Sequence, residues 1–349
     1  MTIAIDAPAD PRLSIVLVGR DGMQTLGPIL SCLSEQTIAA EIELIAVLPK
    51  RAFSDDALVD WQSSFHSVRT VCVPAIGNRG RAAAAGVRLA RAPILAFTEN
   101  HCFPDPVWAD RLCASHSEAY VGVAPVVLNA NPLSHLSWAS YGGGYAEFAD
   151  RGASEEIAEM PLHNTSYLRA ALAPLENELE ELLEHEGKLQ ARLAQNGGRF
   201  LLEHAARTSH INEATWLLVL GLSYFNGRRY GGNRCARWGF GRRFLYAALF
   251  PLLSVNVTRR TFHRLKSCED APSLSPGLFA VVWLQSMAHV MGEAVGYLRG
   301  PRQTFAFVDL EEFMIVERLG GHAVPDLRLA GYIAEARPVD GHLLWGETT

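Results

Sequence analysis

Short apolar runs that alternate with helix-like segments fill the first third of the chain, and they constrain the fold more than any other feature. The runs are rich in Val, Ile and Leu and end at polar or turn residues: Leu13–Val18, Glu43–Leu48, Val68–Val73 and Ile94–Phe97. Runs this short and apolar are typical of strands that are buried on both faces of a parallel sheet. Between them, Met23–Gln36 and Ala82–Ala92 have the pattern of helices. The alternation predicts an α/β fold with a Rossmann-like, doubly wound sheet.

The ends of these runs indicate where a ligand would bind. In a doubly wound sheet, ligands bind beyond the carboxyl ends of the strands. The loop Gly19–Gly22 follows the first run, and Thr98–His101 follows the fourth. We therefore expect the two loops to lie at the same rim of the sheet.

The middle of the chain predicts a further strand and a long helix. Val121–Leu128 has the composition of a strand, and the segment Tyr141–Tyr145 is Gly-rich, as loops are. Met160–Tyr167 is interpreted as a loop or short strand. Leu168–Gln195 has a helical pattern dense in Glu, and Asn196 with Gly197 would cap its C-terminus.

Charge is distributed unevenly along the chain. The net charge is −6, yet no Asp or Glu occurs from Ala214 to Cys268, where ten Lys and Arg residues lie. This basic segment requires an anionic partner, which could be phospholipid, diphosphate or nucleic acid. No recognised nucleic-acid-binding motif accompanies the charge, so we predict no nucleic-acid partner and favour the other two.

The same segment contains apolar stretches between its Arg clusters. Trp216–Phe225 and Phe244–Val257 lie within it, and Gly277–Leu298 follows it; only this last stretch has the roughly 20 residues that cross a bilayer. Arg clusters that border Leu- and Phe-rich runs, with Trp238 and Tyr246 among them, are typical of helices at an anionic membrane surface. A solvated basic surface is the alternative, and whether the last stretch spans the membrane or lies on it stays open.

Cysteine usage and the N-terminus predict the compartment. The six cysteines form no CxxC pair and no dense framework, which favours a reducing setting. The first residues lack the basic and apolar regions of a signal peptide. Together with the basic segment, these features predict a location at the cytoplasmic face of the cell membrane.

One long stretch of motifs resembles a known enzyme family. The order LSIVLVGRDG, SCLSEQT, EIELIAV and GVRLARAPILAFTENHCFPDPVWADRL is similar to the first half of family 2 glycosyltransferases with the GT-A fold. The resemblance covers about residues 13–212, and MGEAVGYLRG near the C-terminus resembles a segment of membrane-linked bacterial members. It implies a hexosyltransferase-type enzyme that moves a sugar from a nucleotide-sugar donor to a hydroxyl acceptor with inversion. A cell-surface glycan or a glycolipid would be the product, and the acceptor would be a glycan or a lipid-linked molecule.

The resemblance implies a metal site at the fourth strand. The family has an Asp-x-Asp motif before a Pro and an aromatic residue, and TENHCFPDPVW places Glu99, Asn100 and His101 in the motif positions. A departing nucleoside diphosphate needs its charge neutralised, usually by a divalent ion that oxygen ligands hold. Glu99 and His101 are thus the predicted ligands of Mn²⁺ or Mg²⁺, and an imidazole suits Mn²⁺ better.

A second carboxylate is expected to take the proton of the acceptor hydroxyl. The family has a Glu-Asp pair before an L-x-x-R-L-x-x-x-G segment, which LQARLAQNG matches, so the resemblance places His185 and Glu186 at the pair. Glu186 is the predicted base, and Glu184 is the alternative. Most other carboxylates of this Glu-rich segment are expected to be solvated surface.

The remaining candidate residues would contact donor or acceptor. His163 and Asn164 resemble the acceptor-side loop of the family, and His210 resembles a histidine that approaches metal or diphosphate. Trp108 is either a core aromatic residue or a platform for the acceptor. The rim position suggests nucleotide contacts for Arg20, Asp21 and Arg81.

The chain departs from the family at two places. Leu48 and Pro49 stand where the second strand normally ends in an Asp that contacts the nucleoside, and Ala83 and Ala84 replace an Arg-Asn pair. These departures leave the nucleotide base undefined.

We therefore predict three segments: a GT-A domain over residues 13–212, a helical membrane-associated region over 213–300 and a tail over 301–349. Two other functions remain as alternatives. One is a non-catalytic GT-A-like binding or scaffold protein at the membrane, which the departures suggest. The other is a nucleotidyltransferase, which the lack of a Gly-rich phosphate loop with a Lys near the first strand disfavours.

Overall fold

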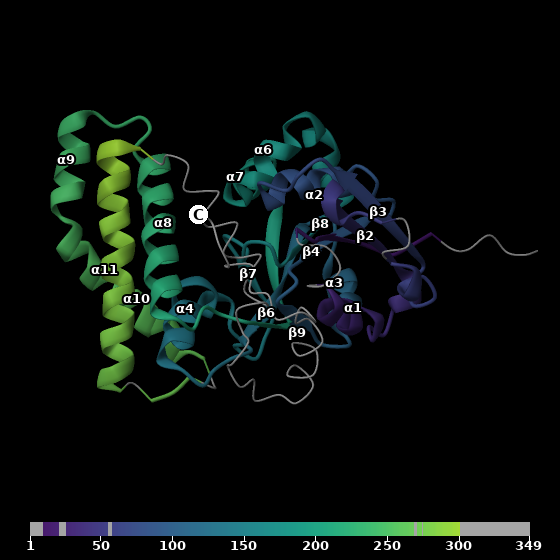
Figure 1. The fold of residues 1–349 in the computed structure, drawn as a ribbon, viewed down its shortest axis with the longest axis horizontal. Helices are drawn as coiled ribbons and strands as arrows, with labels where there is room; N and C mark the ends of the chain where they lie inside the picture. Colours follow the sequence, from purple (N-terminus) through teal and green to yellow (C-terminus); the bar gives the residue numbers. More distant parts are fainter. Residues whose placement is uncertain (1–9, 21–25, 55–57, 269–270, 274, 301–349) are drawn as a thin grey trace, which may run out of the picture. The chain divides into compact units, whose positions relative to one another are not determined.

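The computed structural model describes residues 10–20, 26–54, 58–268, 271–273 and 275–300. The chain forms two compact units. Unit 1 comprises Met1–Val126 and Ala153–Thr208, and unit 2 comprises Val127–Gly152 and Ser209–Thr349. Figure 1 shows their helices and strands. The predicted boundary near residue 212 lies close to the one at Thr208, but residues 127–152 belong with the C-terminal helices, which a linear division of the sequence does not show.

A mixed sheet forms the centre of unit 1. Its strand order is β3-β2-β1-β4-β8-β6-β9-β5, and β7 pairs with β9. The strands β1 to β4 are parallel, whereas β8 is antiparallel to β4 and to β6. The strands are β1 (Leu13–Val18), β2 (Ile42–Pro49), β3 (Ser67–Val73), β4 (Ile94–Thr98), β5 (Cys102–Pro104), β6 (Tyr120–Asn129), β7 (Glu155–Ile157), β8 (Thr165–Leu168) and β9 (Arg199–His210). The four strands predicted from the first third of the chain are confirmed to within one or two residues.

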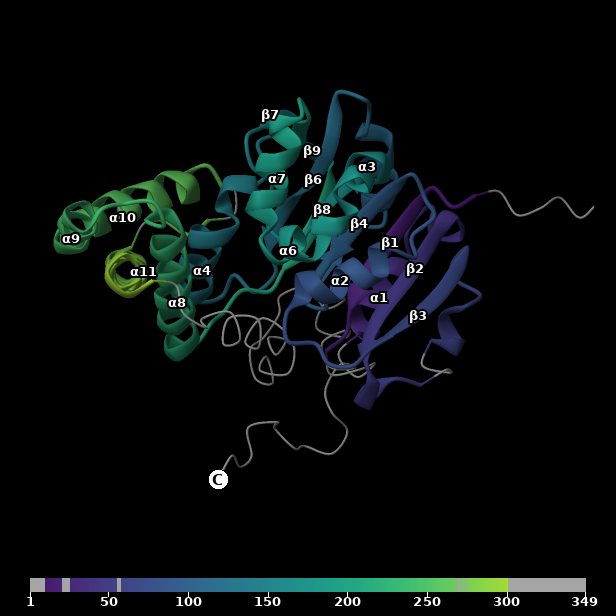
Figure 2. The same cartoon turned by 90° about the horizontal axis from the view of Figure 1, so that it is seen from above.

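Helices cover both faces of this sheet, as Figures 1 and 2 show. On one face, Ile15 and Leu17 of β1 belong to a core cluster with side chains of α1 (Gly27–Ser34) and α3 (Trp108–Ser115). On the other face lies α2 (Arg79–Val87), where a Cβ on Gly86 would meet Val16 Cγ1 at 2.6 Å. Because side chains alternate along a strand, Val16 and Val18 face the α2 side.

The Glu-rich segment after β8 is not the single helix predicted over Leu168–Gln195. It forms α5 (Arg169–Leu172), a 3-10 helix (Ala173–Glu178), α6 (Leu179–Glu184) and α7 (Glu186–Gln195). His185 separates the last two helices with φ −130° and ψ 68°, which are not helical angles. The break makes Glu186 the first residue of α7.

The end of α6, just before this break, packs closely against α2. A Cβ added to Gly80 would meet the backbone of Leu183 and Glu184 well under 3.0 Å, a separation that real Cβ atoms essentially never show. Only glycine permits the start of α2 to lie this close to the end of α6.

Unit 2 is helical. Its helices are α4 (His135–Gly144), α8 (Trp216–Arg234), α9 (Phe240–Ala248), α10 (Phe250–Lys266) and α11 (Pro276–Arg299). The loop predicted at Tyr141–Tyr145 is wrong, because Tyr141 to Gly144 continue α4 and Tyr145 caps it. In α4, Gly142 allows close packing against α10, since a Cβ on Gly142 would lie 2.8 Å from Thr261 Cγ2.

The basic segment is folded into these helices. The helix α8 extends beyond the apolar stretch Trp216–Phe225 through Arg228, Arg229 and Arg234. Among the described residues, α11 is the one helix that is long and apolar enough to cross a membrane by length and composition, and 39% of its apolar window is buried.

Candidate active site

Polar residues after β4 form the buried floor of the candidate site. Glu99, Asn100 and His101 follow the last residue of the strand, Thr98, and are 3%, 4% and 1% exposed. The antiparallel register of β4 and β8 pairs Phe97 with Thr165. This register brings the residues just before β8 alongside those just after β4, so two distant loops meet at one end of the sheet.

Glu99 has partners from both neighbouring elements. Its Oε1 forms an ion pair with the guanidinium group of Arg79, and its Oε2 accepts a hydrogen bond from Asn164 Nδ2 at 2.7 Å. Arg79 is the first residue of α2, and Asn78 caps that helix by accepting from the backbone N–H of Arg81 at 3.0 Å. Since an unpaired buried charge is costly, these contacts allow Glu99 to stay ionised in the interior.

The surroundings of Glu99 include further potential metal ligands. Ligand atoms of Glu99, His101 and Cys102 lie within 4.8 Å of one another. His101 Nε2 is 3.8 Å from Glu99 Oε2, and His101 Nδ1 is 2.9 Å from Asn100 Oδ1. Burial raises the pKa of the Cys102 thiol, which keeps the sulfur protonated and a poor ligand. A carboxylate with an imidazole is a donor set that fits Mn²⁺.

A second carboxylate, Glu186, is held by one histidine. Glu186 is 7% exposed. Its Oε2 accepts from the backbone N–H of His163 at 2.8 Å, and its Oε1 lies 2.8 Å from His163 Nδ1. Burial would raise the pKa of Glu186, but the His163 ring, the His163 backbone N–H and Arg79 outweigh it and lower that pKa. Glu186 is therefore a carboxylate at neutral pH.

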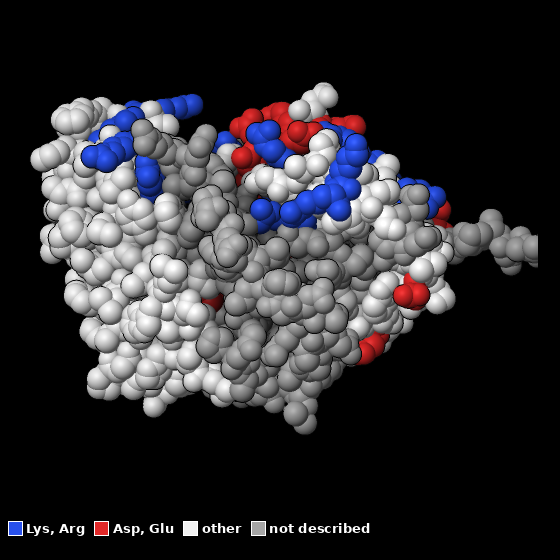
Figure 3. Space-filling view, viewed as in Figure 1, with Lys and Arg blue, Asp and Glu red and all other residues white. Residues whose placement is uncertain are grey.

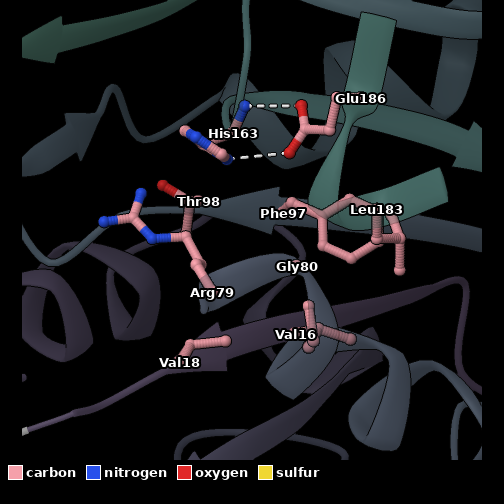
Figure 4. Close-up of a pocket in the computed structure, with 10 residues that line it drawn as sticks. Val16, Val18, Arg79, Gly80, Phe97, Thr98, His163, Leu183 and Glu186 are labelled. Atoms are coloured by element: carbon pink, nitrogen blue, oxygen red, sulfur yellow. Dashed lines mark hydrogen bonds and ion pairs between the residues drawn. The ribbon is translucent and has the colours of Figure 1, made fainter. Parts of the chain in front are cut away.

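His163 has an unusual backbone conformation. Its φ of 66° lies in the left-handed region, and among the described residues it is the one non-glycine with a positive φ. Such a conformation costs roughly 1–3 kcal/mol and persists where the surroundings fix it. Here the two contacts with Glu186 fix it, and they turn both the ring and the backbone N–H toward the same carboxylate (Figure 4).

Both His163 and Glu186 line a pocket in unit 1, which Figure 4 shows. Its wall combines an apolar side from β1 and β4 with a polar side from α2 and α7. The lining residues are Val16, Val18, Arg79, Gly80, Ala83, Phe97, Thr98, His163, Leu183 and Glu186. A basic, an acidic and an imidazole side chain thus share one pocket on the α2 side of the sheet, next to the carboxyl ends of β1 and β4.

Three predicted residues lie beside this pocket without lining it. Glu184 forms an ion pair with Arg81 at 2.6 Å, and the Arg81 side chain is 59% exposed. His185 is the break between α6 and α7. The structure therefore distinguishes Glu186, which lines the pocket, from its neighbour Glu184, which pairs with the exposed Arg81.

The remaining predicted residues are Trp108, Arg20, Asp21 and His210. Trp108 is 1% exposed within the core cluster of unit 1, so its ring has no face available for an acceptor. The carbonyl of Arg20 accepts from Arg51 at 3.3 Å, and Asp21 lies outside the described residues. His210 belongs to unit 2, where its ring lies 4.2 Å from that of Tyr145 and its Nδ1 lies 3.2 Å from Asn212 Oδ1.

Sequence reasoning missed Arg79 and Gly80. The signal for Arg79 was present, because Asn78-Arg79 begins the helix after β3, and the start of that helix lies at the same rim as the ends of the parallel strands. No sequence signal showed that Gly80 would contact the backbone of Leu183, because that contact joins segments about one hundred residues apart.

Comparison with known proteins bears on the fold. No family model matches the chain, and no curated protein matches its sequence. One similar solved structure is the mannosyltransferase PcManGT from Pyrobaculum calidifontis in complex with GDP-Man and Mn²⁺. Its TM-score is 0.50 and its sequence identity 14%, and the match covers 84% of this chain and 89% of PcManGT. TarS of S. aureus in complex with UDP gives a TM-score of 0.45 and 12% sequence identity, and the match covers 83% of this chain and 92% of TarS. The chain has a mixed α/β fold that is similar to a glycosyltransferase.

Proposed function

We propose that the chain is a glycosyltransferase of the family 2, GT-A type, which moves a hexose from a nucleotide-sugar donor to a hydroxyl acceptor with inversion. The observation that carries the proposal is the pair of buried carboxylates, Glu99 and Glu186. Glu99 forms an ion pair with Arg79, and Glu186 is in contact with the ring and the backbone N–H of His163. Inverting transfer needs two such sites, one for the leaving diphosphate and one for the acceptor proton.

The Glu99 side of the site suits the leaving group. We propose that Glu99 and His101 hold a divalent ion, with Mn²⁺ favoured by the imidazole, and that the ion, when bound, neutralises the departing diphosphate. Arg79 pairs with Glu99 and lines the pocket, so its guanidinium group can bind phosphate oxygens from the protein side. The similar mannosyltransferase was solved with GDP-Man and Mn²⁺, which is consistent with this assignment.

The Glu186 side suits the acceptor. In one displacement, the acceptor oxygen would bond to the anomeric carbon while the bond from that carbon to the diphosphate oxygen breaks. The hydroxyl proton would pass to the Glu186–His163 pair. The 2.8 Å contact with His163 Nδ1 fixes the orientation of both groups, which is how carboxylate–imidazole pairs are prepared for proton transfer. Asn164, next to His163, would fix the Glu99 carboxylate through its 2.7 Å hydrogen bond.

Substitution of Glu186 tests the proposal, with Glu184 as the matched control. We expect Glu186→Gln to lower kcat by about a hundredfold or more with little change in donor affinity, because the amide cannot accept the proton. Glu184→Gln, which affects only the surface pair with Arg81, should keep turnover. The measurement is sugar transfer or donor hydrolysis with a panel of nucleotide sugars and Mn²⁺.

The outcomes separate the alternatives. If Glu184→Gln is the damaging change, the base lies two residues earlier. If the wild type binds nucleoside diphosphates but turns over no donor in the panel, the chain is a non-catalytic binding protein with this fold.

A further inference from the structure

In unit 2, the C-terminal half of α8 packs against α11 through glycines. A Cβ on Gly227 or Gly231 of α8 would overlap the backbone of His289 or Glu293. On the other side, a Cβ on Gly292 or Gly296 of α11 would overlap the backbone of Tyr224 or Arg228. On each helix the two glycines are four residues apart, so both backbones approach along one face. This small-residue packing is typical of helices that gain little from burying large side chains against one another.

The helix α10 also places small residues inside and some of its large apolar residues outside. Ser254, Thr258 and Thr261 face the interior and are 1%, 5% and 5% exposed. Two of the large apolar residues of its first half, Leu252 and Val255, are 69% and 61% exposed, whereas Phe250, Leu253 and Val257 are half-buried. A helix of a water-soluble bundle has the opposite pattern, with its apolar stripe inside.

The preceding helix extends the exposed apolar surface. Phe240, Phe244 and Leu245 of α9 are 76%, 59% and 54% exposed. We name these three residues, with Leu249, Leu252 and Val255, the α9–α10 face. Phe240 and Phe244, Leu245 and Leu249, and Leu252 and Val255 are three or four residues apart, so the members of each pair are neighbours on the helical surface. Exposed apolar side chains grouped in this way mark an interaction site.

Arginine and aromatic side chains border this face. The guanidinium group of Arg242 lies 4.2 Å from the Trp238 ring centroid, and that of Arg234 lies 5.5 Å from the Tyr246 centroid. Arg243 donates to the Trp238 carbonyl at 3.0 Å, which ties the loop before α9 to the helix. Figure 3 shows Lys and Arg gathered at one end of unit 2, while the flank below them is free of charged side chains in that view.

We propose that the α9–α10 face binds the surface of a bilayer that contains anionic phospholipid. Its apolar side chains would enter the boundary between headgroups and acyl chains, and the arginines around Trp238 would contact phosphate groups. The absence of Asp and Glu from Ala214 to Cys268 removes repulsion from an anionic surface. With 9 residues, α9 is too short to cross a bilayer, and the second half of α10 contains Arg259, Arg260, Arg264 and Lys266, which do not suit a bilayer core. The face would therefore lie in the interface.

Vesicle co-sedimentation of the full chain tests this proposal, without nucleotide sugar, so the result is independent of the proposed enzyme activity. We expect the wild type to sediment with vesicles of phosphatidylcholine and phosphatidylglycerol, and more weakly with phosphatidylcholine alone. Phe244→Glu combined with Leu252→Glu should reduce the bound fraction about tenfold or more, because two carboxylates would enter an anionic interface. Both sites are exposed, so the fold should be kept, which circular dichroism verifies.

Exposed apolar residues elsewhere provide matched controls. Val59→Glu in unit 1 and Leu133→Glu in unit 2 add the same charge at positions 52% and 68% exposed, and both should bind as the wild type does. Arg242→Gln should weaken binding to the anionic vesicles and reduce its dependence on salt.

Three results would overturn the proposal. The first is a wild type that ignores both kinds of vesicle, and the second is a double variant that binds as well as the wild type. The third is a wild-type dimer in sedimentation velocity that the double variant dissociates, since the face would then bind a second copy of the chain.

Discussion

Replacing Gly80 with Ala tests whether the contact between α2 and α6 sets the geometry of the pocket. In the structure, a Cβ at this position would meet the Leu183 carbonyl carbon and oxygen and the Glu184 nitrogen, all well under 3.0 Å. These are backbone atoms, so no side chain can rotate away. Restoring the 3.4 Å at which ordinary contact begins requires the two helices to separate by about 1 Å or more.

The expected magnitudes follow from this displacement. Overpacking of this kind lowers the free energy of unfolding by about 1–3 kcal/mol, and the higher helix propensity of Ala relative to Gly raises it by up to about 1 kcal/mol. We therefore expect the free energy of unfolding to fall by about 1–2 kcal/mol, which lowers the Tm by about 2–8 °C for a unit of this size. Because Arg79 and Glu186 lie beside the contact, a shift of about 1 Å should also lower turnover by roughly a hundredfold.

Thermal unfolding by circular dichroism and sugar-transfer assays measure the two effects. Gly187→Ala is the matched control, because Gly187 follows Glu186 in α7 and a Cβ there would have no neighbour within 4 Å. That variant should keep turnover and be as stable as the wild type or slightly more so. A Gly80→Ala variant with wild-type Tm and turnover would refute the reasoning.

Two further substitutions test the buried carboxylates. The Glu43 side chain is fully buried and accepts hydrogen bonds from Ser14 Oγ at 2.5 Å and from the Arg91 backbone N–H at 2.8 Å. Burial would raise the pKa of Glu43, but the hydrogen bonds from Ser14, Arg91 and Arg69 outweigh it and lower that pKa. The stability it contributes is present above its unfolded pKa and is lost as the pH falls through the folded one. Glu43→Gln should thus cost about 2–4 kcal/mol in urea unfolding at pH 7, and equal losses at pH 7 and at pH 3 would contradict this. Glu99→Gln should abolish any rise in Tm that Mn²⁺ gives with a nucleoside diphosphate, and an unchanged rise would remove Glu99 from the metal site.

The Glu99→Gln variant should also lose stability, which the sequence did not predict. A carboxylate at the rim of a sheet is expected to contribute little to stability, but Glu99 is 3% exposed and pairs with Arg79. Its loss leaves the guanidinium group without its carboxylate partner in the interior, so Glu99→Gln should also lower the stability of the unliganded protein. Each Tm rise is therefore compared with the same variant without ligand.

Local patterns were sufficient for much of unit 1. The β-branched runs predicted β1 to β4 because burial on both faces of a sheet selects such residues whatever lies elsewhere in the chain. The parallel order of these strands places their carboxyl ends at one rim, so Thr98 to His101 could be assigned to the site region before any contact was known. The Arg-rich, apolar composition likewise predicted the helical character of the C-terminal region.

The choice among similar residues depended on tertiary structure. Six glutamates between Glu176 and Glu186 have nearly the same local sequence, and helical periodicity alone would continue one helix through all of them. The break at His185 turns Glu186 toward His163 and leaves Glu184 with Arg81. The end of α6 just before that break packs against Gly80 of α2, and the neighbouring Arg79 of α2 forms an ion pair with Glu99. Periodicity records which face of a segment is buried, whereas the partner that buries it is selected by packing between segments far apart in the chain.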